Sequence, residues 1–199
     1  VSSGLQLILW GLFKKVVIAD NAARFVEPIY SDPSGFGDLD ILFATYAFAI
    51  QIYFDFSAYT DIARGSARLF GFNLRENFRT PYLAKSIPDF WKRWHISLSS
   101  WFRDYVFSPF YMYVEKNPWL RRLPMKTRHG VAFFATLLIT EFLLGLWHGA
   151  DWTFVVYGCL HALAMCLNRW WRVDVHKRRE LDPKGWGLVW RVFVTLQFI

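Results

Sequence analysis

One stretch of the chain decides the fold: VAFFATLLITEFLLGLWHGADWTFVVYGCLHALAMCL, residues 131–167. Apolar side chains fill 131–147 and again 153–167, and only a short polar segment around His148 separates the two runs. About 20 mainly apolar residues cross a bilayer core as a helix. The pattern therefore predicts a helical hairpin in a membrane. Because 131–147 is slightly short for a full crossing, we expect the turn to lie inside the membrane, where a protein-lined or watery cavity must surround it.

Further apolar segments lie on both sides of this hairpin. Residues 41–59 form a run of membrane length, and another run occupies 189–199. Residues 5–23 form a helix candidate that contains Lys14 and Lys15, which would be costly at the bilayer centre, so we expect it to lie at the interface or to extend its lysines to a surface. Hydrophobic residues make up 54% of the chain, above the roughly 45–50% of soluble domains, so we predict an all-α, polytopic transmembrane bundle.

The net charge of +7 is distributed between the apolar segments. An acidic stretch at 27–40 is expected to be a loop outside the cytoplasm, and the basic stretches 64–128 and 169–184 are expected to lie inside. This arrangement favours membrane lipids over nucleic acid as the partner of the basic residues. It also directs the turn at His148 away from the cytoplasm.

His148 is the first candidate for chemistry. It ends an apolar run and precedes Gly149, and a neutral imidazole suits general-base catalysis at physiological pH. The alternative is a structural histidine that is bonded to a backbone carbonyl. Glu141, seven residues earlier, either orients His148 or pairs with a lysine elsewhere. His161 is read first as a structural residue bonded to a neighbouring helix.

A second candidate lies in the amphipathic segment 90–105, expected to be one helix capped by Ser86. At a spacing of four residues, Trp91 and His95 would share a face of this helix, as an aromatic wall for an acyl or cofactor chain. An interfacial aromatic belt is the competing interpretation. For Asp55, Arg103 and Asp104, the sequence allows either an ion pair or a chemical role. The candidate partners of Asp55 are Arg64, Arg68 or a helix N-terminus. The remaining histidines, His129 and His176, are read as surface residues.

Six segments together resemble the bacterial membrane-bound O-acyltransferases. They are QIYFDFSAYTD (51–61), GFNLRENF (71–78), PYL (81–83), FWKRWHISLS (90–99), GLWHGA (145–150) and LH (160–161). The resemblance is closest to the alginate O-acetyltransferase branch, with the teichoic acid D-alanyl transferases as near relatives. The chain departs from that branch at residues 106–113, where VFSPFYMY replaces a Pro-Leu-Gly-Gly type of turn, and Glu141 is not an expected position.

The resemblance implies that His148 and His95 are catalytic, within a many-helix bundle that surrounds a narrow tunnel. The acyl path and the substrate would be contacted by Trp91, Trp94, Trp147, Asp55, Tyr59, Asn77, Arg103 and Asp104. The donor would be acyl-CoA or an acyl-carrier thioester, with no tightly bound cofactor and no metal. The acceptor would be a polysaccharide or a periplasmic acyl-accepting protein.

Residues 1–199 are accordingly expected to form one partial domain of this family, truncated at both ends, in the bacterial inner membrane. A transporter or polysaccharide-export subunit is the alternative function, since buried polar residues in a membrane funnel also suit transport.

Overall fold

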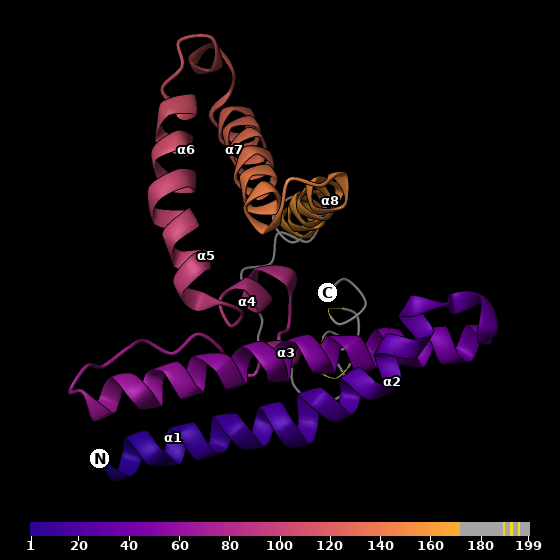
Figure 1. Cartoon of the computed structure of the whole chain (residues 1–199). Helices are drawn as coiled ribbons and strands as arrows, with labels where there is room; N and C mark the ends of the chain where they lie inside the picture. Colours follow the sequence, from indigo (N-terminus) through magenta and orange to yellow (C-terminus); the bar gives the residue numbers. More distant parts are fainter. Residues whose placement is uncertain (172–188, 190–191, 193–194, 196–199) are drawn as a thin grey trace. The chain divides into compact units, whose positions relative to one another are not determined.

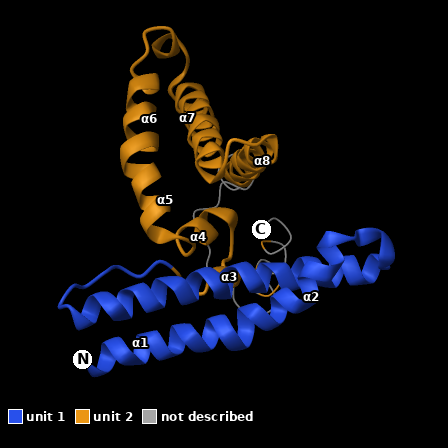
Figure 2. Cartoon of the chain, in the orientation of Figure 1, with its two compact units in different colours: residues 1–77 blue, residues 78–199 orange. Residues whose placement is uncertain are grey.

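The structure is a computed structural model that describes residues 1–171 together with residues 189, 192 and 195. Every regular element within 1–171 is helical, which confirms the predicted all-α class. Three helical segments, Ser2–Ser31, Asp38–Leu69 and Met125–His148, are long and apolar enough to cross a membrane. His176 and most of the predicted run at 189–199 lie outside the described residues. The chain divides into two compact units, residues 1–77 and 78–199 (Figure 2).

The first unit is a long helical hairpin (Figure 1). Its first arm is continuous and consists of α1 (Ser2–Phe13), the π-helical η1 (Lys14–Ala19) and α2 (Asp20–Ser31). The short η2 (Pro33–Gly35) leads to the second arm, α3 (Asp38–Leu69).

The expected loop at 27–40 is therefore wrong in its extent. Helix α2 continues through Pro28 to Ser31, and α3 already begins at Asp38. The backbone N–H of Gly37 donates to the Asp40 carboxylate at 3.1 Å, which closes the first turn of α3. Acidic residues are favoured at a helix N-terminus by the helix dipole, so these acids belong to the start of a helix and not to a loop.

Small residues bring α1 and α3 close together. A Cβ atom on Gly4 would lie 2.8 Å from the carbonyl oxygen of Gly65, and one on Gly11 would lie 2.8 Å from that of Ala58. Helix pairs in membranes often pack through such small residues, because their backbones can then approach closely.

The adjacent lysines of η1 are paired with carboxylates of α3. Lys14 Nζ lies 2.7 Å from Asp61, and Lys15 Nζ lies 2.7 Å from Asp55. The expectation that the lysines reach a surface is wrong for Lys14, whose side chain is 12% exposed. The partner of Asp55 is Lys15, not Arg64 or Arg68. Pairing removes much of the cost of burying Lys14 and Asp61.

The second unit begins with three short elements, η3 (Pro81–Leu83), α4 (Ile87–Trp91) and α5 (Ile96–Phe102). Helix α5 continues without a break through the π-helical η4 (Arg103–Phe107) into α6 (Ser108–Glu115), so residues 106–113 are helical. After η5 (Leu120–Arg122), this helix is followed by α7 (Met125–His148), which runs beside it, and α8 (Trp152–Arg169) packs on α7 (Figure 1).

The predicted hairpin of the second unit is confirmed by α7 and α8. Two glycines allow its arms to touch: a Cβ on Gly145 would overlap the carbonyl group of Phe154, and one on Gly158 would overlap that of Glu141. This contact sets α8 directly against the end of α7, next to His148.

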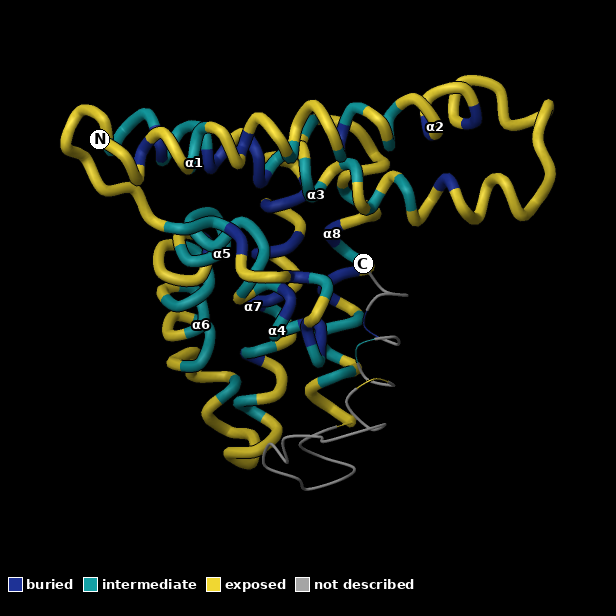
Figure 3. Tube along the Cα trace, turned by 90° about the horizontal axis from the view of Figure 1, so that it is seen from below, coloured by how far each residue is buried: buried dark blue, intermediate teal, exposed yellow. Residues whose placement is uncertain are grey.

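Large apolar side chains remain exposed along the helices of both units, where exposed positions outnumber buried ones (Figure 3). Such exposure is costly in water but not in lipid, so it agrees with the membrane character that the sequence predicts.

Candidate active site

His148 is the last residue of α7, and its side chain is exposed. The backbone N–H of Thr153 donates to the Asp151 carboxylate at 2.9 Å, so Asp151 caps α8 and only residues 149–151 separate the two helices. Three aromatic rings surround the imidazole of His148, with centroids 5.0 Å (Trp147), 6.1 Å (Phe154) and 6.4 Å (Tyr157) away. The predicted base is thus held by packing on one side and open on another.

His95 lies in a turn and not inside a helix. The expected single helix over 90–105 is wrong, because α4 ends at Trp91 and α5 begins at Ile96. His95 precedes α5 with φ 40° and ψ 56°, a left-handed conformation that costs a non-glycine residue about 1–3 kcal/mol. Consequently, Trp91 and His95 are not neighbours on one helical face.

Local contacts impose this break. The predicted cap is confirmed, since Ser86 Oγ accepts from the Asp89 backbone N–H at 3.3 Å. Asp89 also binds Arg93 Nε at 3.0 Å, and the Arg93 carbonyl accepts from the backbone N–H of Arg79 at 3.0 Å. That carbonyl is therefore occupied by a neighbouring segment and does not continue the helix.

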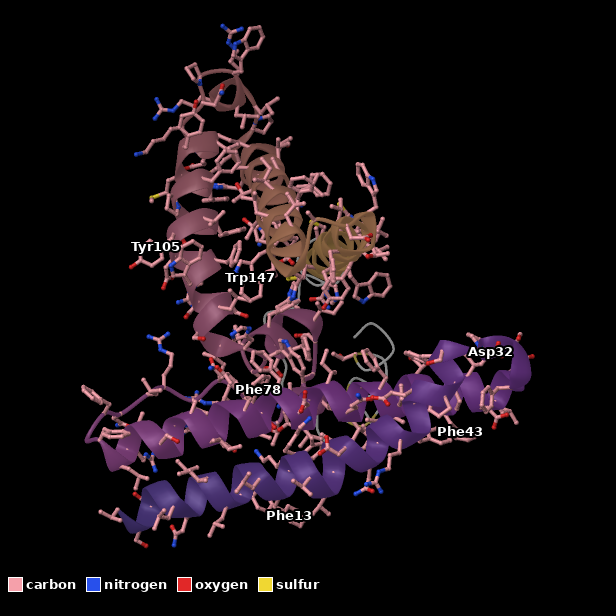
Figure 4. All side chains as sticks on the ribbon, in the orientation of Figure 1. Phe13, Asp32, Phe43, Phe78, Tyr105 and Trp147 are labelled. Atoms are coloured by element: carbon pink, nitrogen blue, oxygen red, sulfur yellow. The ribbon has the colours of Figure 1, made fainter. Side chains whose placement is uncertain are left out.

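The two predicted catalytic histidines meet at Trp147. The ring centroids of His95 and Trp147 lie 6.1 Å apart, and those of Trp147 and His148 lie 5.0 Å apart. Figure 4 labels Trp147, near the end of α7. Burial, together with the charge that His148 carries when protonated, lowers the pKa of His95 below its ordinary range. His95 is therefore neutral at pH 7, with one ring N–H available as a donor.

Another set of rings joins this pair. Tyr157 lies between His148 and His161, with its centroid 4.4 Å from that of His161. Trp91 of α4 meets His161 edge-on at 5.4 Å. Sequence reasoning overlooked Tyr157, although its spacing of four residues from His161 in an apolar run places both on one helical face.

His161 was expected to be hydrogen-bonded to a neighbouring helix. It is only 5% exposed, and among the described residues its Nδ1 atom has no hydrogen-bond partner. Its contact with another helix is the ring contact with Trp91.

Trp94, proposed for the acyl path, packs in a neighbouring aromatic cluster. Its ring lies 5.0 Å from Phe78, 5.5 Å from Phe90 and 6.3 Å from Tyr82. The cluster supports the turn that carries His95. A direct role for Trp94 in the acyl path stays a prediction.

The other substrate-binding candidates belong to different elements. Arg103 and Asp104 form an ion pair with each other in η4, at 2.7 Å. Tyr59 is exposed on α3, while Asn77 follows that helix as the last residue of the first unit. Asp55 is bound to Lys15, which favours its ion-pair interpretation.

Two further points concern metals and His129. Within the described part of the chain, no three His, Cys, Asp or Glu side chains are grouped to hold a metal ion.

His129 was read as a surface residue, but it lies in α7 and its Nδ1 atom is 2.9 Å from the hydroxyl of Tyr111 in α6. It therefore joins two helices of the second unit.

Comparison with known proteins agrees with this site. The model of the membrane-bound O-acyltransferase family matches residues 39–197. A probable alginate O-acetylase of Azotobacter vinelandii is 37% identical over 189 residues, which cover 93% of this chain and 34% of that protein. A peptidoglycan O-acetyltransferase of Helicobacter pylori is 34% identical over 100% of this chain and 34% of its own length.

A teichoic acid D-alanyltransferase of Bacillus subtilis is 34% identical, over 77% of this chain and 38% of that protein. The chain thus spans about a third of the length of the curated relatives that it matches. The family match covers most of the chain and includes both histidines of the site. This membrane protein therefore belongs to the membrane-bound O-acyltransferase family, a family of acyltransferase enzymes.

Proposed function

We propose that the protein transfers an acyl group, most simply acetyl, from a thioester donor to a hydroxyl acceptor during modification of the cell envelope or an exopolysaccharide. The observation that carries this proposal is the meeting of His95 and His148 at Trp147. The similar proteins support it, because they are a probable alginate O-acetylase, a peptidoglycan O-acetyltransferase and a teichoic acid D-alanyltransferase.

His148 is the general base of the proposed reaction. Its imidazole takes the proton of the acceptor hydroxyl while the oxygen attacks the thioester carbonyl. The C–S bond then breaks, and the protonated imidazole returns the proton to the leaving thiolate, so that the reaction yields an ester and a thiol. General-base catalysis of this kind contributes about 10²–10⁴-fold in rate. The exposure of His148 supports this role, since a base must reach its substrate.

His95 donates a hydrogen bond to the thioester carbonyl and to the oxyanion that forms from it. A neutral imidazole has one N–H for this purpose, and the lowered pKa of His95 keeps the ring neutral at pH 7. Removing one preorganised donor of this type costs about 10²–10³-fold in kcat. The left-handed backbone of His95 supports this role, since strained conformations gather at functional sites.

The donor enters from the cytoplasmic side as acyl-CoA or as an acyl-carrier thioester, and no tightly bound cofactor takes part. The acceptor is a polysaccharide or a periplasmic acyl-accepting protein. Trp91 and Trp147 line the acyl path. We place the protein in the inner membrane as a multi-pass protein, with its basic segments in the cytoplasm.

The test uses a strain that lacks the complete gene and is complemented with variants. We expect His148→Gln to abolish ester-linked acetyl groups on envelope glycans, and His95→Gln to reduce them about 10²-fold or more, as measured by mass spectrometry. The matched control is His129→Gln, which removes a histidine from the same helix but away from this site. It should leave acetylation unchanged.

The same strains distinguish the transport alternative. If the protein exports a polymer, deletion of its gene lowers the amount of exported polymer. The acetyl content per sugar of the remaining polymer is then unchanged. Full acetylation in both histidine variants would eliminate the proposed reaction mechanism.

A further inference from the structure

We propose that Tyr157 is a positioning residue for the base His148, and that it acts together with the buried side chains of Glu141 and His161. The inference rests on the proposed function and adds to it a group that neither the family resemblance nor the comparisons assign.

Tyr157 connects an exposed layer of the site to a buried one. Its ring meets His148 edge-on, with planes at 85° and centroids 6.4 Å apart, and meets His161 at 4.4 Å. Tyr157 is 38% exposed, whereas His161 is 5% exposed. The tyrosine is therefore the described side chain that touches both histidines.

Glu141 belongs to the buried layer. It lies two helical turns before His148 on α7 and is 6% exposed. Its backbone carbonyl packs against Gly158, the residue after Tyr157, so Glu141 and Tyr157 lie at the same close contact of α7 with α8. Among the described residues, Glu141 forms no ion pair, and its Oε2 atom has no hydrogen-bond partner.

Stability alone does not account for this carboxyl group. A buried polar group without a partner destabilises a fold by about 1–3 kcal/mol, and a leucine would fill the same space between α7 and α8 without that cost. Tyr157 precedes the glycine on which Glu141 packs and reaches His148, so the inference assigns the effect of Glu141 to that residue.

The buried polar atoms of Glu141 and His161 cannot contact the substrate directly. Glu141 Oε2 and His161 Nδ1 are both inaccessible to solvent, and neither has a hydrogen-bond partner among the described residues. Any influence of these atoms on the reaction must pass through a side chain that reaches the exposed layer. Tyr157 is in the position to transmit it.

The chemical consequence concerns the orientation of His148. A general base must present one ring nitrogen to the hydroxyl proton, and a third group that orients the imidazole is a common part of such sites. The edge of Tyr157 restricts the ring plane of His148, while Glu141 and His161 hold Tyr157 from behind. Substitution of Tyr157 or of Glu141 should therefore loosen the same support.

The experiment measures transfer from [14C]acetyl-CoA to alginate oligosaccharides in membrane vesicles that contain the complete protein. Tyr157→Phe and Glu141→Gln should each lower kcat by about 3- to 10-fold, with KM for acetyl-CoA changed by less than about twofold. The double variant should lose no more than either single variant, because both act through one chain of contacts. A purely structural role would instead lower the amount of folded protein.

The matched control is Tyr111→Phe. It removes the phenol hydroxyl of α6 that contacts His129 of α7, and His129 lies about 28 Å from His148 along α7. It should leave kcat unchanged. Size-exclusion chromatography reports the folded fraction, so each kcat refers to folded protein. Unchanged kcat in Glu141→Gln, or losses that multiply in the double variant, would overturn the inference while the proposed function stands. No transfer by the unmodified protein to alginate, together with unchanged envelope acetylation in the strain that lacks the gene, would remove both.

Discussion

The polar contact between η1 and α3 in the first unit and the polar contact between α7 and α8 in the second unit are satisfied in opposite ways. In the first unit, Lys14 and Lys15 of η1 are each bound to a carboxylate of α3 at 2.7 Å. In the second unit, Glu141 and His161 lie at the α7–α8 contact with polar atoms that have no hydrogen-bond partner among the described residues.

This difference indicates a structural role for the paired charges of the first unit and a chemical role for the polar groups near His148. A satisfied ion pair inside a helical hairpin stabilises one register of the two helices, and it leaves little capacity to bind or react. Polar groups held without partners beside an exposed imidazole are costly to keep, but they remain free to act on a reacting group. We therefore expect substitutions in the first unit to change stability, and substitutions around His148 to change activity.

The largest expected change in stability comes from Lys14→Met. Breaking a buried ion pair from one side costs about 3–5 kcal/mol when the remaining charge is left unpaired. Because Arg64 still pairs with Asp61 in this variant, the loss should lie near the lower end of that range. Thermal unfolding in detergent should show a large drop in the melting temperature. An additional Asp61→Asn substitution should restore part of it. Unchanged stability in Lys14→Met would show that the paired charges do not hold the first unit together.

Gly145→Ala should have the next largest effect. Its new Cβ atom would overlap the carbonyl group of Phe154, so α7 and α8 must separate, at a cost of about 1–3 kcal/mol. Transfer activity should fall as well, because this contact positions Tyr157 beside His148. The control is Gly130→Ala in the same helix, where a Cβ atom meets nothing within 4 Å and should stabilise α7 slightly. Equal effects of the two substitutions would contradict the close approach.

Lys15→Met sharpens the comparison within the first unit. The Lys15 side chain is 46% exposed, so its pairs with Asp55 and Asp20 should contribute less than about 1 kcal/mol. The same unfolding assay should therefore show a much smaller shift than for Lys14→Met. If acetyl transfer fell sharply while stability held, Asp55 and Lys15 would have a chemical role after all.

The smallest effect concerns the titration of His95. Because its pKa is lowered, its ring should remain neutral at pH values where an ordinary histidine is already protonated. Replacing His148 with Gln removes one cause of the shift but not the burial, so the pKa of His95 should rise part of the way toward its ordinary range. NMR titration of histidine-labelled protein, assigned with His95→Gln, measures both values. No response of His95 to the His148 substitution would argue against their proximity.

Apolar runs and short turns made the helical hairpins predictable from sequence. The runs at 41–59 and 131–147 became the centres of α3 and α7, and the HGAD segment marked the turn before α8. The apolar period predicted helix centres better than helix ends. The acids at the start of α3 were assigned to a loop, although acidic residues are also favoured at a helix N-terminus.

The candidate site was predictable in part. His95 and His148 were identified from their motifs, and the structure brings their rings together at Trp147. The break in the helix at His95 was missed, because it depends on bonds of Arg93 to Asp89 and to the distant Arg79. Tyr157 was missed because its spacing of four residues to His161 gains meaning only once the structure places His161 next to the site.

The amino-acid sequence by itself determined the helical class, the membrane character, the family and the two histidines of the site, since hydrophobic period and motif spacing are local properties. Only the tertiary structure decided which carboxylate pairs with which lysine, that His95 occupies a strained turn, and that Tyr157 links His148 to His161. These features depend on contacts between helices that are far apart in the chain, where close packing at small residues selects the neighbours.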